Sequence, residues 1–373
     1  MKYYIIAGEA SGDLHGSNLI REMKKLDPAI SVRCWGGDKM QAAGGELVKH
    51  YRELAFMGFT EVLMNLRTIF RNLAFCKEDI TQYQPDALIL IDYPGFNLRI
   101  SKWAKQQGLK VIYYISPQVW AWKEGRVRMM KECIDKMIVI LPFEKDYFKN
   151  KWNWEVEYVG HPLVDVVASR ESGVSSPEQG LSDRPIVALL PGSRKQEILK
   201  KLPVMLETSR YFPGYQFIVA KAPGLDESFY DELLRPFENV SYVSGKTYEL
   251  LMQAEAAIVT SGTATLETAL FGVPEVVCYK GSPISYQIAK RVIKVKYISL
   301  VNLIMDRLVV KELIQDALTP ENLKTELEEL LHNQQRRAQL KSDYAELKSR
   351  LSQQGSASAR AAKSIVDFIS GKD

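Results

Sequence analysis

Two short segments combine glycine, hydroxyl and charged side chains in a pattern suited to phosphate binding. LLPGSR and SGTATLE each follow an apolar run and lead into a helical pattern. Backbone N–H groups at a helix N-terminus bind phosphate oxygens, and a guanidinium group can hold them bidentately. Either segment alone is also typical of an ordinary helix N-cap, but two of them in one half of the chain favour a nucleotide diphosphate. The residues concerned are Gly192, Ser193, Arg194, Ser261, Gly262 and Thr263.

An acidic residue follows the second of these segments by one helical turn. We expect Glu267 to accept hydrogen bonds from the two ribose hydroxyls of the nucleotide, as the acidic residue of dinucleotide-binding folds does. The alternative is a solvated carboxylate stabilised by the helix dipole. The chain contains no Asp-x-Asp pair, so we expect no divalent metal on the diphosphate.

The first half of the chain offers carboxylates at the ends of two apolar runs. The run ALILID ends at Asp92, which we interpret as a general base, although an aspartate before Pro-Gly is more often a turn-former. The opening strand leads into the loop GEASGD, which also contains Glu9 and whose Ser11 and Asp13 would face the same space. His15 is a second candidate base.

The segment SPQVWAW adds polar and aromatic side chains after another apolar run. Ser116 and Gln118 alternate with Trp120 and Trp122, and this combination suits a sugar. Tryptophans that alternate in this way are equally consistent with a packed core.

One helical segment is amphipathic with a basic margin. Its apolar positions recur with helical spacing, and Arg67 and Arg71 lie beside them. The pattern is consistent with a buried crossover helix, or with a helix that lies in a membrane interface or admits acyl chains. The apolar positions are Val62, Leu66, Ile69, Phe70 and Leu73.

Short β-branched strands alternate with amphipathic helices along the chain and predict an α/β protein with parallel sheets. The alternation stops in a segment rich in Ser, Gly and Pro and then restarts, which predicts two Rossmann-like domains facing each other across a cleft. We assign an N-terminal domain to residues 1–164, a linker to 165–185 and a C-terminal domain to 186–340. The helical tail 341–373 either crosses back to the first domain or is exchanged in a dimer.

Composition narrows the function classes. A net charge of +4 over 373 residues is too small for a dedicated nucleic-acid-binding protein. The four cysteines are scattered, which favours a reducing cytoplasm over a disulfide framework or zinc site. No stretch approaches membrane-spanning length, so any membrane contact is expected to be peripheral.

The motifs AGEASGD, IDYPGFN, SPQVWAW, LPFE, GHPL, LLPGSR, SGTATLE and KELIQ occur in the order seen in the lipid-A-disaccharide synthase family, which the chain resembles over nearly its whole length. The resemblance implies a two-domain glycosyltransferase of the GT-B type that works without metal. It implies transfer from UDP-2,3-diacylglucosamine to 2,3-diacylglucosamine 1-phosphate, with inversion, at the cytoplasmic face of the inner membrane. The products would be UDP and a β-1′,6 disaccharide.

The resemblance also implies roles for single residues. Asp92 would deprotonate the 6-hydroxyl of the acceptor, Arg194 would bind the diphosphate, and Asn302 in YISLVN would contact the nucleotide or a phosphate. Val301 stands where the family often has proline, which affects the placement of Asn302. Members of the family can exchange C-terminal segments in a homodimer, and the helical tail permits this.

Two other functions are consistent with parts of the sequence. Another GT-B enzyme, such as a UDP-N-acetylglucosamine 2-epimerase, would explain the two phosphate-binding loops, but not the opening loop together with SPQVWAW. A non-catalytic lipid- or nucleotide-binding module would explain the amphipathic helix.

Overall fold

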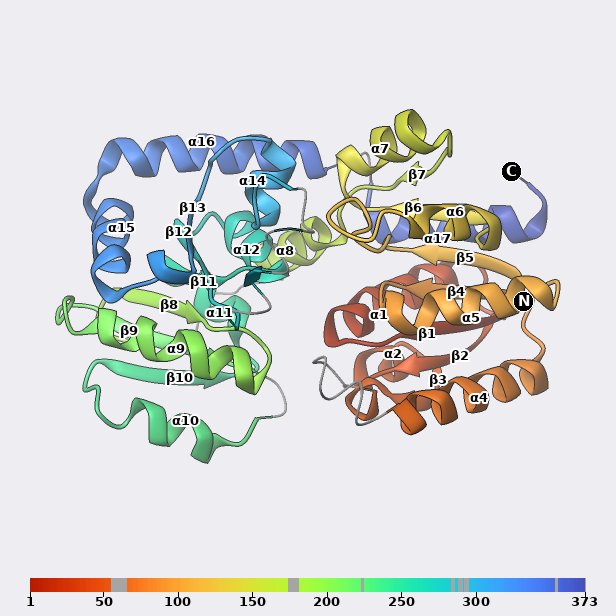
Figure 1. The fold of residues 1–373 in the computed structure, drawn as a ribbon, viewed down its shortest axis with the longest axis horizontal. Helices are drawn as coiled ribbons and strands as arrows, with labels where there is room; N and C mark the ends of the chain where they lie inside the picture. The colour runs from red at the N-terminus through yellow and green to blue at the C-terminus, as the bar shows by residue number, and fades with distance from the viewer. Residues whose placement is uncertain are drawn as a thin grey trace. The chain divides into compact units, whose positions relative to one another are not determined.

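The computed structural model describes residues 1–54, 66–173, 181–222, 225–282, 286–287, 291, 295–352 and 355–372. The chain divides into two compact units. The N-terminal unit comprises Met1–Pro162 together with Leu351–Asp373, and the C-terminal unit comprises Leu163–Arg350. Each unit contains a parallel sheet covered by helices, which confirms the predicted α/β class with two Rossmann-like domains (Figure 1).

The described strands of the N-terminal unit form a seven-stranded sheet in the order β3-β2-β1-β4-β5-β6-β7. Strand order therefore reverses between β1 and β4, where a doubly wound sheet binds its ligand. The strands are short apolar runs because both faces of the sheet are covered; all five residues of β4 are buried. The strands are β1 (Lys2–Ala7), β2 (Ser31–Gly36), β3 (Glu46–His50), β4 (Ala87–Ile91), β5 (Lys110–Tyr114), β6 (Lys136–Val139) and β7 (Glu157–Tyr158).

Helices cover both faces of this sheet. Tyr4 and Ile6 of β1 pack in one core with Leu73 and Ile80, which lie on the helix Leu66–Tyr83, and with Ile100. A proline in the first turn begins two of the helices, where its missing N–H costs no hydrogen bond. The helices are α1 (Ala10–Leu26), α2 (Asp38–Ala42), the 3₁₀ turn η1 (Tyr51–Glu53), α4 (Leu66–Tyr83), α5 (Pro94–Gln106), α6 (Arg126–Cys133), α7 (Pro142–Trp152) and α17 (Ala357–Ser370).

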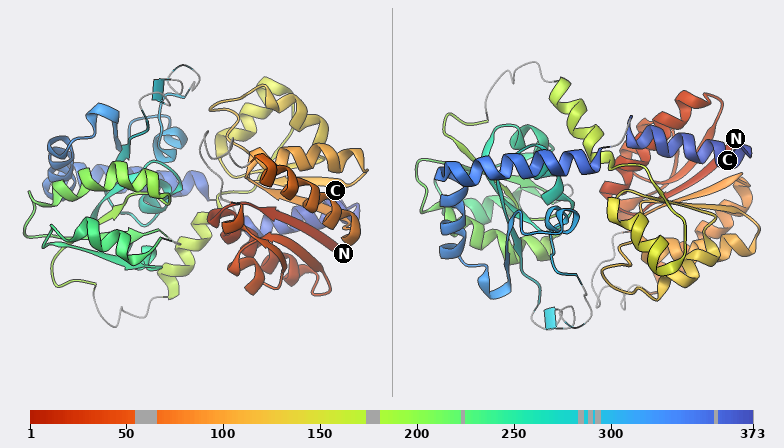
Figure 2. Two further views of the ribbon diagram at one scale, coloured as in Figure 1. Left: turned by 60° about the horizontal axis from the view of Figure 1, so that its bottom comes forward. Right: turned by 90° about the horizontal axis from the view of Figure 1, so that it is seen from above.

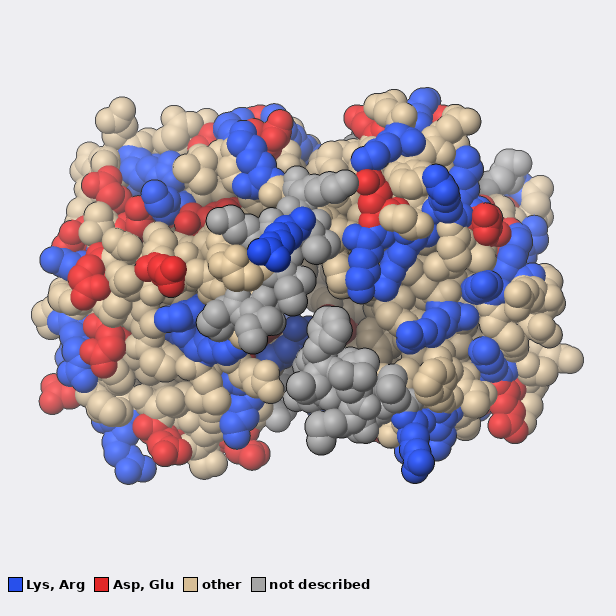
Figure 3. Space-filling model, viewed as in Figure 1, with Lys and Arg blue, Asp and Glu red and all other residues tan. Residues whose placement is uncertain are grey.

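Basic side chains gather on the outer surface of α5 and α6 (Figure 3). Acidic side chains are few on these two helices, where Glu132 is the one acidic residue. The exposed basic residues there are Arg99, Lys102, Lys105, Arg128 and Lys131.

The described strands of the C-terminal unit form a six-stranded parallel sheet in the order β10-β9-β8-β11-β12-β13. Strand order reverses here between β8 and β11, so this unit has a switch point of the same kind. The strands are β8 (Ile186–Leu190), β9 (Gln216–Lys221), β10 (Val240–Ser244), β11 (Ala254–Thr260), β12 (Glu275–Tyr279) and β13 (Lys311–Ile314).

The helices of the C-terminal unit follow its strands in alternation, as crossover connections require. They are α8 (Pro162–Gly173), α9 (Lys195–Ser209), α10 (Glu227–Leu234), α11 (Thr247–Leu251), α12 (Thr263–Leu270), α14 (Leu300–Met305), the 3₁₀ turn η2 (Gln315–Ala317), α15 (Pro320–His332) and α16 (Gln334–Leu351).

The predicted domain boundaries need correction in two places. The expected linker 165–185 begins inside α8, which runs from Pro162 to Gly173. This helix packs into the protein through Leu163 and Val167, which lie one helical turn apart and are both buried. Residues 174–180 of that linker lie outside the described residues. The C-terminal unit extends to Arg350 rather than to residue 340, since most of α16 belongs to it.

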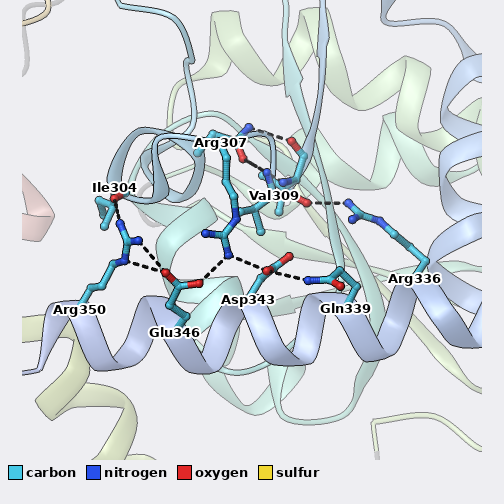
Figure 4. Close-up of polar contacts among 10 residues, drawn as sticks. Ile304, Arg307, Val309, Arg336, Gln339, Asp343, Glu346 and Arg350 are labelled. Carbon is cyan, nitrogen blue, oxygen red and sulfur yellow. Dashed lines mark hydrogen bonds and ion pairs between the residues drawn. The ribbon is translucent and has the colours of Figure 1, made fainter.

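Helix α16 is held to its own unit by a network of charged residues (Figure 4). Arg307, just after α14, donates to Asp343 at 2.8 Å and to Glu346 at 2.7 Å. Arg350 donates to the opposite carboxylate oxygen of Glu346 and to the carbonyl oxygen of Ile304. The next helix, α17, lies against α1 in the N-terminal unit (Figure 2). Its small and aliphatic side chains, such as Ala361 and Ile365, are buried.

Candidate active site

The switch point of the N-terminal sheet brings two carboxylates together. Strands β1 and β4 are parallel neighbours, with Ala7 opposite Ile91. Glu9 and Asp92 therefore follow adjacent strands at the carboxyl edge of the sheet, where open α/β sheets bind ligands. The register of these strands thus brings Glu9 and Asp92 to one edge of the sheet.

Asp92 has an unusual backbone conformation. Its φ is +45°, and that of the following residue, Tyr93, is +48°. Two consecutive non-glycine residues in the left-handed region persist only where the surroundings hold them, and such strain concentrates at functional sites. The amide of Asn97 donates to the carbonyl oxygen of Asp92 at 2.8 Å, and the Tyr113 hydroxyl donates to the same oxygen. Asn97, the last residue of the motif IDYPGFN, thus holds the backbone at Asp92.

The environment of Asp92 raises the pKa of its carboxyl toward neutral pH. Burial, and secondarily the negative charge of Glu9, raise the pKa of the Asp92 carboxyl to about 7. A general base is most effective when its pKa lies near the working pH. The imidazole of His15, the second candidate base, is a much weaker base, because burial lowers its pKa to about 4.

Asp13 does not face the sheet edge as the sequence analysis predicted. Its carboxylate accepts hydrogen bonds from the backbone N–H groups of Gly37 at 2.8 Å, Lys39 at 3.2 Å and Met40 at 3.0 Å. Asp13 therefore caps the N-terminus of α2 and has a structural task. Ser11 is half-buried in the first turn of α1, next to Glu9 along the chain.

The segment 116–122 is held by a hydrogen bond to Glu144, a residue for which the sequence predicted no role. Glu144, in LPFE, is buried and accepts from Trp120 Nε1 at 3.1 Å and from the backbone N–H of Leu141 at 3.1 Å. Burial raises the pKa of the Glu144 carboxyl to about 8. Ser116 is also buried and donates to the Pro117 carbonyl oxygen, so of the two polar side chains predicted here only Gln118 is exposed.

The two predicted phosphate-binding loops meet at the switch point of the C-terminal sheet. They follow β8 and β11, which are parallel neighbours. Gly192 has φ +111° and Gly262 has φ +150°, conformations that favour glycine. Both glycines line a cavity of about 220 Å³ together with Ser193, Ser261 and Thr263.

The charged residues that line this cavity are Glu197, Lys221 and Glu267, and Arg194 directly follows the lining residue Ser193. Arg194 is the N-cap of α9, and its Nη1 donates to Glu197 Oε1 at 3.2 Å. Glu267, on α12, also lines the cavity and accepts from the Tyr248 hydroxyl at 3.1 Å. The loop backbones and Arg194 can bind a diphosphate, and Glu267 can accept from hydroxyl groups.

Asn302 is placed differently from its predicted role. It is fully buried, and its amide donates to the Val310 carbonyl oxygen at 2.8 Å and to Glu312 at 2.9 Å. Its Oδ1 accepts from the backbone N–H groups of Val309 at 2.8 Å and Val310 at 2.9 Å. These four bonds occupy the amide within the protein, so Asn302 fixes the chain after α14 and we do not assign it to the nucleotide.

Helix α4 shows both faces that the sequence suggested. Leu73 is buried and Ile69 packs against the core, whereas Phe70 is 63% exposed, with Arg67 and Arg71 exposed beside it. Val62 lies outside the described residues, and only the backbone of Leu66 is described. No helix among the described residues is long and apolar enough to cross a membrane.

Comparison with known proteins agrees with this arrangement. A profile of the family described as lipid-A-disaccharide synthetase matches residues 3–366. The chain belongs to the lipid-A-disaccharide synthase family. The synthases of Geobacter metallireducens and Syntrophus aciditrophicus are each 41% identical to it, over 99% of this chain and 97% and 98% of theirs. This chain is accordingly a glycosyltransferase that serves the synthesis of the lipid A disaccharide.

Solved structures with much lower sequence identity share the fold of this synthase-family chain. A putative UDP-N-acetylglucosamine 2-epimerase from Listeria monocytogenes matches with a TM-score of 0.66 at 12% identity, covering 100% of this chain and 97% of that one. The glycosyltransferase of kitacinnamycin matches with a TM-score of 0.65 at 14% identity, covering 98% of each chain. These likenesses show the GT-B fold.

Proposed function

We propose that this enzyme transfers the diacylglucosaminyl group of UDP-2,3-diacylglucosamine to the 6-hydroxyl of 2,3-diacylglucosamine 1-phosphate. Asp92 removes the hydroxyl proton as the acceptor oxygen bonds to the anomeric carbon of the donor. The bond from that carbon to the diphosphate breaks on the opposite face, and UDP leaves with its electron pair. The configuration inverts, which gives a β-1′,6 linkage.

The observation that carries this proposal is the state of Asp92. Its backbone is held in the left-handed region at the switch point, and its pKa is raised to about 7 by burial and by Glu9. A carboxylate that serves only as a turn-former needs no such environment. Glu9 and Ser11 then contact the acceptor sugar beside Asp92, and Gln118 offers a further exposed polar group.

The donor is assigned to the cavity of the C-terminal unit. Its diphosphate lies against the loops at Gly192 and Gly262 and against Arg194, and its ribose lies at Glu267. Backbone N–H groups and one guanidinium group stabilise the charge that develops on departing UDP, so the assignment requires no metal ion.

The acylated substrates require contact with a lipid surface. We assign this contact to α4, whose exposed Phe70 is flanked by Arg67 and Arg71, and to the basic surface of α5 and α6. An apolar side chain beside arginines binds anionic bilayers by insertion and charge together. The chain thus acts as a peripheral enzyme on the cytoplasmic face of the inner membrane. An exchange of C-terminal segments in a homodimer stays a prediction.

One assay tests the reaction. Purified enzyme receives both acylated substrates in detergent and EDTA, and mass spectrometry follows UDP and disaccharide phosphate. We expect product despite the chelator, and a loss of roughly 10²–10⁴-fold for Asp92→Asn. Release of UDP without disaccharide, or full activity of the variant, contradicts the proposal.

A further inference from the structure

The phosphate-binding cavity contains a carboxylate that works against a bound anion. Glu197 lines the cavity, and its Oε2 lies 2.9 Å from the position that a Cβ on Gly192 would occupy. The carboxylate therefore sits directly beneath the loop that is assigned to the diphosphate. A negative group at this position repels a diphosphate unless another charge compensates it.

Two cations share Glu197, and they differ in their freedom to move. Arg194 Nη1 lies 3.2 Å from Oε1 and Lys201 Nζ lies 3.8 Å from Oε2. The Arg194 side chain is 47% exposed, whereas that of Lys201 is 3% exposed. Arg194 can turn toward a ligand in the cavity, but Lys201 is enclosed one helical turn after Glu197 on α9.

The burial of Lys201 needs an explanation, because an ammonium group is costly to remove from water. Burial lowers the pKa of Lys201, while the nearby carboxylate of Glu197 favours its charged form. The next residue back, Lys200, is exposed and lies on the outside of the same helix. A fixed ammonium group on the buried side of the helix stabilises the Glu197 carboxylate in a way that a surface lysine cannot.

We propose that Lys201 is a positioning residue for the donor diphosphate, which it serves by compensating Glu197 when Arg194 leaves that carboxylate for the phosphates. Glu197 holds Arg194 in place while the site is empty, and Lys201 keeps Glu197 paired once the site is filled. This inference rests on the proposed donor site.

The test measures dissociation constants of UDP and uridine by titration calorimetry. Lys201→Met weakens UDP binding roughly tenfold and leaves uridine binding within about twofold, because only the diphosphate meets the uncompensated carboxylate. Glu197→Gln tightens UDP binding, and adding Lys201→Met to it changes the UDP affinity by less than about twofold, because no carboxylate charge remains to be compensated. Lys200→Met is the matched control and changes neither constant.

The outcomes separate this inference from the donor site itself. The role of Lys201 is overturned if Lys201→Met weakens the binding of UDP and of uridine equally. It is also overturned if Lys201→Met leaves the UDP dissociation constant unchanged. If Lys201→Met does not fold, the comparison of Glu197→Gln with the double variant decides, since a double variant that binds UDP about tenfold more weakly than Glu197→Gln would show that Lys201 does not act through Glu197. Failure of the wild-type enzyme to bind UDP overturns the proposed donor site.

Discussion

The ring of Tyr93 packs directly against Gly8: a Cβ added to Gly8 would lie 2.3 Å from Tyr93 Cγ. This contact joins the loop after β1 to the loop after β4. Because Tyr93 is bonded to Asp92, the absence of a side chain at residue 8 sets the position of the proposed base.

Gly8→Ala is therefore expected to displace Tyr93 and, with it, Asp92. We expect a loss of activity of roughly 100-fold, because a shift of about 1 Å at a reacting group has an effect of that size. Steady-state kinetics with both substrates measure it. Gly125→Ala is the control, since a Cβ there meets no atom within 4 Å. Activity of Gly8→Ala within twofold of wild type would mean that the two loops are independent.

The pH dependence of kcat/KM tests Asp92 and Glu9 together. The base is active when deprotonated, so kcat/KM rises with pH through an apparent pKa of about 7. Glu9→Gln removes a negative charge that raises this pKa, and the rising limb should move to lower pH. An unchanged limb in Glu9→Gln would show that another group sets the profile.

Glu144 makes the stability of the enzyme depend on pH. Its carboxyl has a pKa of about 8 in the folded protein and an ordinary value of 4.5. Between these values the folded state keeps a proton that the unfolded state releases, so the free energy of unfolding falls as pH rises.

The variant Glu144→Gln carries no titratable group at this position. Compared with that variant, the wild type should lose on the order of a few kcal/mol of its free energy of unfolding between pH 5 and 8. Urea denaturation at several pH values measures the difference. Glu155→Gln is the control, because the Glu155 side chain is 72% exposed. Parallel pH profiles for wild type and Glu144→Gln would exclude a buried protonated carboxyl.

Asn302→Ala separates structure from binding. The variant leaves backbone groups of Val309 and Val310 without their partner, and we expect a loss of about 2–4 kcal/mol in the free energy of unfolding. The folded fraction should bind UDP with nearly wild-type affinity. Asn322→Ala, at an exposed position, is the control for denaturation. A tenfold loss of UDP affinity with an unchanged free energy of unfolding would instead show that Asn302 contacts the nucleotide.

The fold and the general location of both sites could be predicted from the sequence. Apolar runs that end in GEASGD, IDYPGFN, LLPGSR and SGTATLE identify strand ends, and parallel pairing brings strand ends to one edge. The proximity of Glu9 and Asp92 follows from the fact that β1 and β4 are adjacent strands.

The contacts of single polar residues could not be predicted. Asp13 caps a helix that begins 25 residues later in the chain, and Asn302 bonds to a segment beyond its own helix. Glu144, Glu197 and Lys201 are buried or half-buried charged residues, and the sequence does not distinguish them from solvated ones. Such residues acquire their tasks only from neighbours that the fold brings to them.

The return of α17 to the N-terminal unit affects the order in which the chain can fold during synthesis. The C-terminal unit is one continuous stretch, Leu163–Arg350, and has all its residues as soon as Arg350 leaves the ribosome. The N-terminal unit, although begun first, waits for the helix that covers α1. The domain translated first is thus completed last, and until then α1 exposes to solvent, or to chaperones, the surface that α17 later buries.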